Sequence, residues 1–362
     1  MRMALVDFVD WDYDVDTPFE RPLGGAHSAA CYLAIALARQ NHQTLYINNT
    51  TRPGLRRGVH CANWQQIAPP RLGDVGADAY IVLLGAGNGR ALKNVIAPQS
   101  KLILWTGHAH TESDVQYLSN PLERDAYNGI ALVSEWQAAR YREHFHIPTE
   151  RIGILRNAIS PAFENVFPAA APILSQKPQP PIFAYTSTPF RGLHVLLDLW
   201  PRIRERIPGS VLRVFSSMQV YNMAPSADAA AYGVLYDRCR TMEGVEYLGA
   251  VPQPELAQQL KQASLLVYPN TFAETSCISV MEAMAAGCDI VTTALGALPE
   301  TLGAFGQAIT PGPQYAEQFI DAVVRRAASY GEDRARALVD HAQRNLTWDV
   351  RAREWTEWIA RL

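Results

Sequence analysis

The sequence predicts an α/β protein made of two domains, each with a parallel sheet. Its 362 residues exceed one average domain and leave room for two hydrophobic cores. Short apolar runs rich in β-branched and aromatic residues alternate with amphipathic segments, a pattern typical of strand–helix units in a parallel sheet. One proline-rich stretch interrupts this alternation. We therefore predict a first domain over residues 1–160, a linker over 161–180 and a second domain over 181–346.

In the first domain the strands and helices alternate regularly. Strands are expected at Ala4–Val9, Thr44–Ile47, Ala79–Leu84, Lys101–Trp105 and Gly129–Val133. Helices are expected where apolar residues recur at helical spacing, at Ala26–Arg39 and Glu135–Phe145. Ser134 directly precedes the second of these helices, and its hydroxyl is expected to cap the helix.

The second domain follows the proline-rich stretch, in which six prolines exclude a helix interior and a central strand. Strands are then expected at Ile182–Thr186, Val211–Phe215, Val245–Leu248 and Leu265–Tyr268, with helices at Leu193–Ile207, Ala227–Met242 and Pro254–Ala263. The terminal segment, about 347–362, carries Trp348, Trp355 and Trp358. So much aromatic surface predicts a helix that docks, and we expect it to dock on the first domain.

Composition is that of a soluble globular protein. Hydrophobic residues make up 48% of the chain and charged residues 19%, with a net charge of −3, so nucleic acid is not indicated as a partner. The five cysteines are widely spaced and include no CxxC pair, which indicates neither a disulfide framework nor a zinc site. No apolar run is long enough for a membrane span, and no signal-like segment opens the chain. We expect a cytoplasmic protein, with peripheral membrane contact and the oligomeric state left open.

The strongest functional pattern lies between Asn270 and Glu300, where Glu274 and Glu282 are eight positions apart. A strand is expected to end before the first glutamate, and a helix capped by Ser276 or Ser279 is expected to carry the second. Even in one continuous helix, these carboxylates would be about 80° and roughly 12 Å apart. They are therefore expected to bind different parts of one ligand, or separate ligands, rather than to act as one acid–base pair.

A helix that starts after a strand offers free backbone N–H groups to a diphosphate, and a carboxylate further along that helix can accept hydrogen bonds from a ribose diol. Two structural alternatives stand beside this interpretation. Ser279 and Glu282 have the spacing of a capping box, and Glu274 could be a solvated loop carboxylate.

The two glutamates, the following Ala-Met-Ala-Ala-Gly and the later Gly-Ala-Leu-Pro-Glu together resemble the donor-site signature of the family-four retaining glycosyltransferases. That family has the GT-B fold, in which two Rossmann-like domains face each other across a cleft. The resemblance implies that Glu274 contacts the transferred sugar and that Glu282 binds the ribose hydroxyls. It also implies that backbone amides between them contact the sugar and diphosphate, at Thr275, Ser276, Cys277 and Ile278.

A second pattern, residues 186–193, ends the first strand of the second domain and opens its first helix. Arg191 could there clamp phosphate oxygens and stabilise charge on a leaving diphosphate; the alternative is an exposed arginine at a helix start. Many family members have an arginine and then a lysine–glycine pair here. In this chain Arg191-Gly192 takes the second place, while Tyr185, Thr186 or Ser187 stands at the first. Either one cation suffices, or hydroxyls and amides around Ser187 compensate.

Two further segments of the first domain resemble the same family. Gly24-Gly25, before the helix Ala26–Arg39, permits a close approach of backbone to an anion and resembles the family's opening glycine loop, although a Gly-Gly pair alone is often an ordinary turn. His108 and His110 follow the strand Lys101–Trp105. Metal binding is not indicated, because no partner ligand has suitable spacing. The resemblance favours His108 as the histidine near the sugar, and a structural histidine is the alternative.

The resemblance therefore implies a retaining glycosyltransferase that uses a UDP- or GDP-sugar and needs no cofactor or metal. Arg191, His108 and Glu274 are the expected catalytic residues. The alternatives are a catalytically silent nucleotide-sugar-binding subunit and a GT-B sugar-nucleotide epimerase. The acceptor is not indicated, and Arg52, Arg56 and Arg57 could contact an anionic acceptor or simply be solvated.

Overall fold

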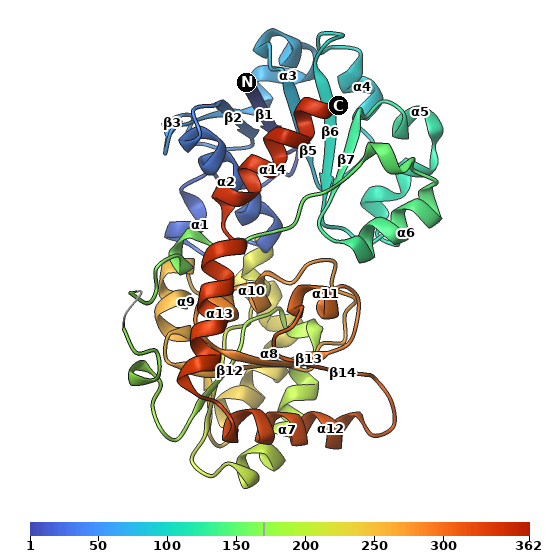
Figure 1. Ribbon diagram of the computed structural model, residues 1–362. Coiled ribbons are helices and arrows are strands. Elements are labelled where there is room, and N and C mark those ends of the chain that lie inside the picture. Colours follow the sequence, from blue (N-terminus) through green and yellow to red (C-terminus); the bar gives the residue numbers. More distant parts are fainter. Residues whose placement is uncertain (169–170) are drawn as a thin grey trace. The chain divides into compact units, whose positions relative to one another are not determined.

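The computed structural model describes residues 1–168 and 171–362, which form two compact units. The first unit contains Met1–Pro18, Gly25–Ala158 and Trp348–Leu362, and the second contains Phe19–Gly24 and Ile159–Thr347. Each unit is built around one sheet with helices packed on it (Figure 1). This architecture confirms the predicted α/β class with two parallel-sheet units. The short segment Phe19–Gly24 differs from expectation, because it packs with the second unit and not with the first.

The first unit has an eight-stranded sheet with the order β3-β4-β2-β1-β5-β6-β7-β8. The pairing of β3 with β4 is antiparallel, and the other recorded pairings in this sheet are parallel. The strands are β1 Arg2–Val6, β2 Gln43–Asn48, β3 Gly54–Arg56, β4 Val59–Asn63, β5 Ala79–Leu83, β6 Lys101–Thr106, β7 Gly129–Leu132 and β8 Ile152–Ile154. The helices are α2 Gly25–Arg39, α3 Trp64–Arg71, α4 Gly89–Lys93, α5 Pro121–Arg124, α6 Glu135–Phe145 and α14 Trp348–Arg361. Helix α1 Thr17–Glu20 begins in the first unit and ends in the second.

Local chemistry explains why α6 was predicted at its observed bounds. The Ser134 hydroxyl accepts a hydrogen bond from the Gln137 backbone N–H, and His146 at the other end adopts a left-handed conformation. The β3–β4 hairpin was not predicted. Its turn, Arg57-Gly58, has positive φ at both residues, and an arginine gives little sequence signal for such a turn.

The tryptophans of α14 belong to the core of the first unit. Trp348 and Trp355 are completely buried, and both rings pack on Trp105 of β6. Trp358 packs on strands β7 and β8 at two glycines, where a Cβ added to Gly153 would lie only 2.4 Å from the indole. The aromatic residues of this terminal segment are therefore used to hold the helix against the sheet.

The second unit has a six-stranded sheet with the order β11-β10-β9-β12-β13-β14, and its recorded pairings are parallel. The strands are β9 Ile182–Tyr185, β10 Val211–Val214, β11 Val245–Tyr247, β12 Ala263–Tyr268, β13 Asp289–Thr293 and β14 Gln307–Ile309. The helices are α7 Leu193–Arg206, α8 Pro225–Thr241, α9 Gln253–Leu260, α10 Ile278–Ala285, α11 Leu298–Leu302, α12 Tyr315–Ala328 and α13 Glu332–Asn345.

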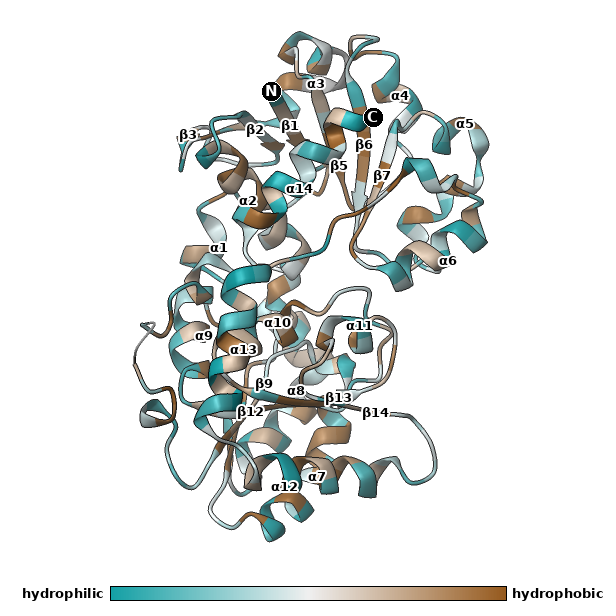
Figure 2. Ribbon diagram, viewed as in Figure 1, coloured by the Kyte–Doolittle hydropathy of each residue, from teal (hydrophilic) through white to brown (hydrophobic). Residues whose placement is uncertain are grey.

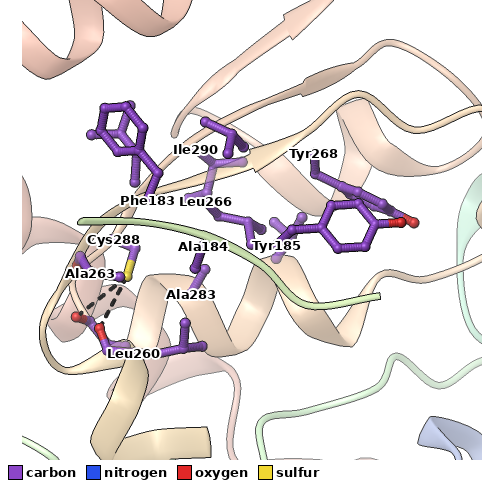
Figure 3. Packing of buried hydrophobic residues seen from close by; sticks show 14 of the residues in the cluster. Phe183, Ala184, Tyr185, Leu260, Ala263, Leu266, Tyr268, Ala283, Cys288 and Ile290 are labelled. Carbon is purple, nitrogen blue, oxygen red and sulfur yellow. Dashed lines mark hydrogen bonds between the residues drawn. The ribbon is translucent and has the colours of Figure 1, made fainter. Parts of the chain in front are cut away.

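Hydrophobic residues are concentrated on the strands and on the inner faces of the helices, as the hydropathy colouring shows (Figure 2). In the second unit the core includes Phe183, Leu266 and Ile290 from adjacent strands (Figure 3). The Cys288 thiol lies beside them and donates to the carbonyl oxygen of Ala263, 3.1 Å away. No helix in the described part of the chain is long and apolar enough to cross a membrane.

The proline-rich segment 161–180 is part of the second unit and does not stand between two units as a linker. Phe163 and Ile173 are completely buried in that unit's core. The Lys177 ammonium is also buried and donates hydrogen bonds of 2.6 Å to the carbonyl oxygens of Ala263 and Ala286. Prolines exclude regular structure, but they do not prevent a segment from packing. Residues 169 and 170 lie outside the described part of the chain.

Candidate functional site

The carboxyl ends of β9 and β12 meet in the middle of the second sheet. From β9 the chain continues to β10 and β11 on one side, while β12, β13 and β14 follow on the other. The strand order therefore reverses between β9 and β12, and open parallel sheets bind ligands at such a reversal. The loops that leave these two strand ends carry Ser187, Arg191 and Glu274.

Arg191 and Glu274 form an ion pair, with 2.9 Å between Nη1 and Oε1. Both side chains are largely buried, and the guanidinium lies 4.7 Å from the centre of the Phe272 ring. Burial opposes the charge on Arg191, but the carboxylate of Glu274 and the phenol of Tyr221 outweigh it and raise the pKa of Arg191. Glu274 is therefore a buried, paired carboxylate, and the solvated-loop alternative does not hold for it.

Glu274 is also held by the end of β12. The Tyr268 hydroxyl donates to Glu274 Oε1 over 2.6 Å and lies 3.2 Å from the Ser187 hydroxyl. The Glu274 carbonyl accepts a hydrogen bond from the backbone N–H of Ala297. Gly296 makes this approach possible, because its φ is +62° and an added Cβ would lie 2.4 Å from that carbonyl oxygen. The glycine turn after β13 thus braces the loop that carries Glu274.

Several buried polar atoms near these loops have no hydrogen-bond partner among the described residues. They are Thr186 Oγ1, Thr188 Oγ1, Arg191 Nε and Ser276 Oγ. Buried polar groups in native proteins are nearly always paired. Four unpaired atoms on two neighbouring loops therefore indicate a place where a polar ligand supplies the missing partners.

Helix α10 begins at Ile278, with Cys277 at the capping position and no side-chain cap. The expected cap by Ser276 or Ser279 is wrong, because the Ser279 hydroxyl instead donates to the Thr186 carbonyl over 2.5 Å. The capping-box alternative for Glu282 also fails. Its Oε1 accepts a 3.4 Å hydrogen bond from the Ser160 backbone N–H, and the carboxyl group is buried. Glu274 and Glu282 thus have separate partners within the protein.

Of the two predicted glycines, Gly24 lies in the second unit and Gly25 begins α2 in the first. A Cβ on Gly24 would lie 3.0 Å from the ring of Tyr221, whose hydroxyl accepts a 3.4 Å hydrogen bond from Arg191. Gly24 is therefore placed beside a partner of Arg191. The short glycine segment itself is what lets the tyrosine ring pack against the main chain.

His108 follows β6 in the first unit, and its main chain is firmly held. Its carbonyl accepts hydrogen bonds from the Gln137 amide over 2.8 Å and from the Tyr141 hydroxyl over 2.9 Å. The imidazole is partly exposed and lies within 4 Å of carboxylates of Glu112 and Asp114. His110 instead packs edge-on against another histidine, at 5.4 Å between ring centres. The structure thus gives the two histidines different surroundings.

A buried histidine–aspartate pair at the carboxyl end of β1 was not predicted. His27 Nε2 lies 3.4 Å from Asp7 Oδ2, and the Tyr13 hydroxyl donates to the same carboxylate. Burial lowers the pKa of His27, although Asp7 opposes this change, so the imidazole is neutral at pH 7. The available sequence signal was only the position of His27 just after the glycine pair.

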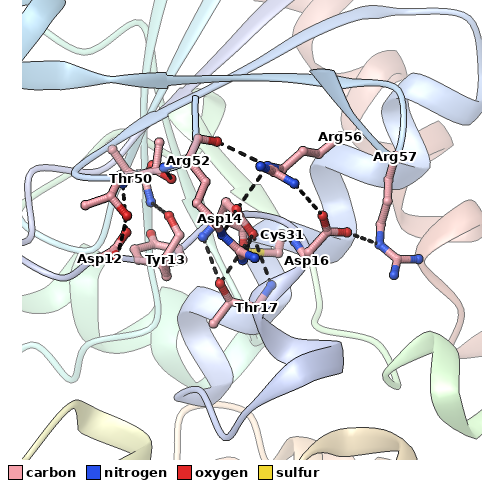
Figure 4. Close-up of polar contacts among 12 residues, drawn as sticks. Asp12, Tyr13, Asp14, Asp16, Thr17, Cys31, Thr50, Arg52, Arg56 and Arg57 are labelled. Carbon is pink, nitrogen blue, oxygen red and sulfur yellow. Dashed lines mark hydrogen bonds and ion pairs between the residues drawn. The ribbon is translucent and has the colours of Figure 1, made fainter. Parts of the chain in front are cut away.

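The three arginines Arg52, Arg56 and Arg57 are paired with aspartates inside the first unit. Arg52 and Arg56 contact the buried carboxylate of Asp14, and Arg57 contacts Asp16 over 2.6 Å (Figure 4). All three side chains also stay partly exposed, so these arginines contact solvent while they hold the two aspartates. Within residues 1–168 and 171–362, no group of three His, Cys, Asp or Glu side chains could hold a metal ion.

Residues 181–328 match the sequence profile of the family Glycosyl transferases group 1. The second unit is therefore similar in sequence to group 1 glycosyl transferases. The match covers the loops with Arg191 and Glu274 as well as helix α10, so it coincides with the site described above. No curated protein sequence matches the chain.

Solved structures share the fold over the whole chain. A glycosyltransferase from Rickettsia africae ESF-5 is 12% identical, with a TM-score of 0.73 and coverage of 99% of this chain and 98% of its own. Sucrose-phosphate synthase from Thermosynechococcus elongatus is 13% identical, with a TM-score of 0.69 and coverage of 98% of both chains. The pneumococcal O-GlcNAc transferase GtfA, in complex with UDP and GlcNAc, is 12% identical, with a TM-score of 0.57 and coverage of 78% and 56%. The chain thus has the GT-B fold.

In the second unit, the burial of Glu282 predicts a distinctive dependence of stability on pH. Burial raises the pKa of Glu282 to about 8, and the Ser160 N–H opposes this only in part. The folded protein then holds a proton that the unfolded chain releases near its ordinary pKa of 4.5. The proton on Glu282 therefore makes its full contribution to the free energy of unfolding below about pH 4.5. This contribution is lost as the pH rises through about 8. At about 1.4 kcal/mol per pKa unit, the loss amounts to a few kcal/mol.

Replacement of Glu282 by glutamine is therefore expected to remove this slope, because the amide does not titrate. Denaturant unfolding of both proteins between pH 5 and 9 measures it. The variant should gain stability over the parent at pH 9 and differ little at pH 5. If the free energies of unfolding of the two proteins differed by the same amount at every pH, the result would contradict a proton on Glu282.

The second unit also contains site residues that the sequence did not indicate: Tyr221, Tyr268 and Phe272. Each is an aromatic residue of the kind that usually packs in a core, and Tyr268 ends a strand that is largely apolar. Only the tertiary structure brings them to Arg191 and Glu274. The sole signal for Tyr268 was its position at the carboxyl end of a strand, where ligands are bound.

Proposed function

We propose that the protein is a glycosyltransferase that moves a sugar from a nucleotide-sugar donor, a UDP- or GDP-sugar, to an acceptor. The Arg191–Glu274 pair at the strand-order reversal is the observation that carries this proposal. It brings a guanidinium, suited to phosphate oxygens, next to a carboxylate, suited to sugar hydroxyls. The unpaired hydroxyls of Thr186, Thr188 and Ser276 add further groups for a donor.

The roles of the donor residues follow from the chemistry of each group. Arg191 stabilises the charge on the leaving diphosphate, with help from Ser187. Glu274 accepts hydrogen bonds from the transferred sugar, and Glu282 accepts them from the ribose. Backbone amides contact the sugar and diphosphate, at Gly24, Gly25, Thr275, Ser276, Cys277 and Ile278. His108 of the first unit is a further proposed catalytic residue.

The proposed reaction retains the anomeric configuration and uses no metal. The bond from the anomeric carbon to the diphosphate breaks, and the acceptor oxygen attacks that carbon on the same face. The leaving diphosphate takes the acceptor proton, so the protein needs no nucleophile of its own. Electrostatic stabilisation of the leaving group is then the main contribution of the protein. We place the reaction in the cytoplasm, with an acceptor that is a glycan, a lipid or a small molecule.

A silent nucleotide-sugar-binding subunit is the second candidate. The observation that favours it is the single cation in the loop after β9, where Thr186 and Ser187 precede Arg191 without a second arginine or lysine. A sugar-nucleotide epimerase is the third. It would interconvert donor sugars with no acceptor present.

A screen of UDP- and GDP-sugars separates these functions. Release of nucleoside diphosphate is measured with purified protein, alone and with pools of glycan, lipid and small-molecule acceptors, and remaining donors are separated by chromatography. A transferase should release one nucleotide faster when an acceptor is added. Binding without release would indicate the silent subunit, and conversion of the donor into its epimer would indicate the epimerase.

A further inference from the structure

Tyr268 lies at the point where the two loops of the donor site meet. It is the last residue of β12, its side chain is buried, and its ring packs edge-on against Tyr185 of the neighbouring strand at 5.7 Å between centres (Figure 3). Packing therefore fixes the conformation of this side chain, and the sheet sets the position of its hydroxyl. A hydroxyl fixed in this way can orient the groups that it contacts.

The hydroxyl joins groups from both loops. It donates to Glu274 Oε1 over 2.6 Å and lies 3.2 Å from the Ser187 hydroxyl. Burial, together with the Glu274 carboxylate, raises the pKa of Tyr268, so the phenol stays protonated and remains a donor at any physiological pH. A connected chain of polar contacts thus runs from Ser187 through Tyr268 and Glu274 to Arg191.

The two oxygens of Glu274 are used differently. Oε1 accepts from both Tyr268 and Arg191, whereas no hydrogen bond found among the described residues uses Oε2. Two donors on one oxygen fix the plane of the carboxylate. The other oxygen is left as an acceptor for a donor group of a ligand. A sugar hydroxyl is such a donor, and a fully ionised phosphate is not.

We propose that Tyr268 is a positioning residue of the donor site, which orients Glu274 so that Oε2 accepts a hydroxyl of the donor sugar. The proposal rests on the proposed function and adds a residue to it. It also explains how one loop cation is sufficient, since the tyrosine couples the Ser187 hydroxyl to the carboxylate that holds Arg191. The sugar contact and the diphosphate contact then depend on one another.

The test compares Tyr268→Phe with Tyr236→Phe. Tyr236 is another buried tyrosine of the same unit, and its hydroxyl also donates to a carboxylate over 2.6 Å, that of Asp228. The probes are the UDP- or GDP-sugar that the wild-type protein turns over and the matching nucleoside diphosphate. For Tyr268→Phe, we expect turnover of the nucleotide sugar to fall about 10–100-fold, the range for loss of a hydrogen bond to a charged group. Affinity for the nucleoside diphosphate should change less than about threefold.

Several results would overturn the proposal. They are unchanged turnover in Tyr268→Phe, an equal loss in Tyr236→Phe, or an equal loss of affinity for the nucleotide with and without its sugar. If Tyr268→Phe unfolds, Ser187→Ala is measured instead, and a turnover equal to that of the wild type then counts against the proposal. A wild-type protein that neither binds nor cleaves any nucleotide sugar would contradict the proposed function itself. An active wild type with an unaffected Tyr268→Phe variant would contradict only the role of Tyr268.

Discussion

Replacing Arg191 by alanine is expected to slow nucleotide release from the sugar donor about 10²–10³-fold, which corresponds to roughly 3–4 kcal/mol of transition-state stabilisation. The reason is that Arg191 is the cation which the loop after β9 presents at the strand-order reversal, held by Glu274 and Tyr221. Initial rates under saturating donor measure the effect. Because Arg191 acts on charge that develops as the diphosphate leaves, the maximal rate should fall more than the affinity for donor.

Arg202→Ala is the matched control. Arg202 lies in the same unit and forms a 2.6 Å pair with Glu317, but that pair is exposed on the surface. Its loss should leave the rate unchanged. Arg191→Ala also leaves the Glu274 carboxylate without its cation, which destabilises the fold. The double variant Arg191→Ala/Glu274→Gln should recover stability but not activity. If Arg191→Ala released nucleotide as fast as the wild type, Arg191 would not stabilise the leaving diphosphate.

Replacing Gly192 by alanine is expected to cost about 2–4 kcal/mol of stability and most of the activity. Gly192 has φ of +107°, and an added Cβ would lie 2.1 Å from the carbonyl oxygen of Pro269. That contact joins the loop of Arg191 to the loop of Glu274. Both the strained backbone and the clash push these loops apart, so thermal unfolding should move down by several degrees and donor turnover should fall with it.

Gly233→Ala is the control: the same substitution is expected to stabilise the protein there, whereas Gly192→Ala is expected to destabilise it. Gly233 lies within α8, its φ is not in the left-handed region, and no atom lies within 4 Å of an added Cβ. Alanine there should raise stability by about 0.5–1 kcal/mol, because it lowers the entropy of the unfolded chain. If Gly192→Ala behaved like Gly233→Ala, the close approach of the two loops would not hold.

Capping residues and the spacing of apolar residues predicted several strands and helices close to their observed bounds. Helix α6 begins and ends where its capping serine and helical periodicity place it, and β9 followed by α7 lies within a residue of expectation. The proline-rich segment shows the limit of such signals. Proline reports on backbone conformation, whereas burial of Phe163 and Ile173 depends on the core that forms around them.

The candidate site was predictable only in part, for a similar reason. From the sequence alone, the spacing of Glu274 and Glu282 predicted two separate binding roles. The partners of Glu274 are long-range contacts, however, and Arg191 lies 83 positions earlier in the chain. Tyr268 was hidden because an aromatic residue at a strand end is usually part of a core. The paired state of Arg52, Arg56 and Arg57 depends likewise on aspartates some 40 positions away.

The stereochemistry of the product tests the central claim most directly. An α-linked UDP- or GDP-sugar is incubated with the protein and an acceptor identified by the screen, and the anomeric proton of the product is examined by NMR. The account predicts an acceptor that has gained one sugar in the α configuration, with one nucleoside diphosphate released per transfer. A β-linked product would contradict transfer on one face of the sugar, and an unmodified acceptor with intact donor would contradict the glycosyltransferase itself.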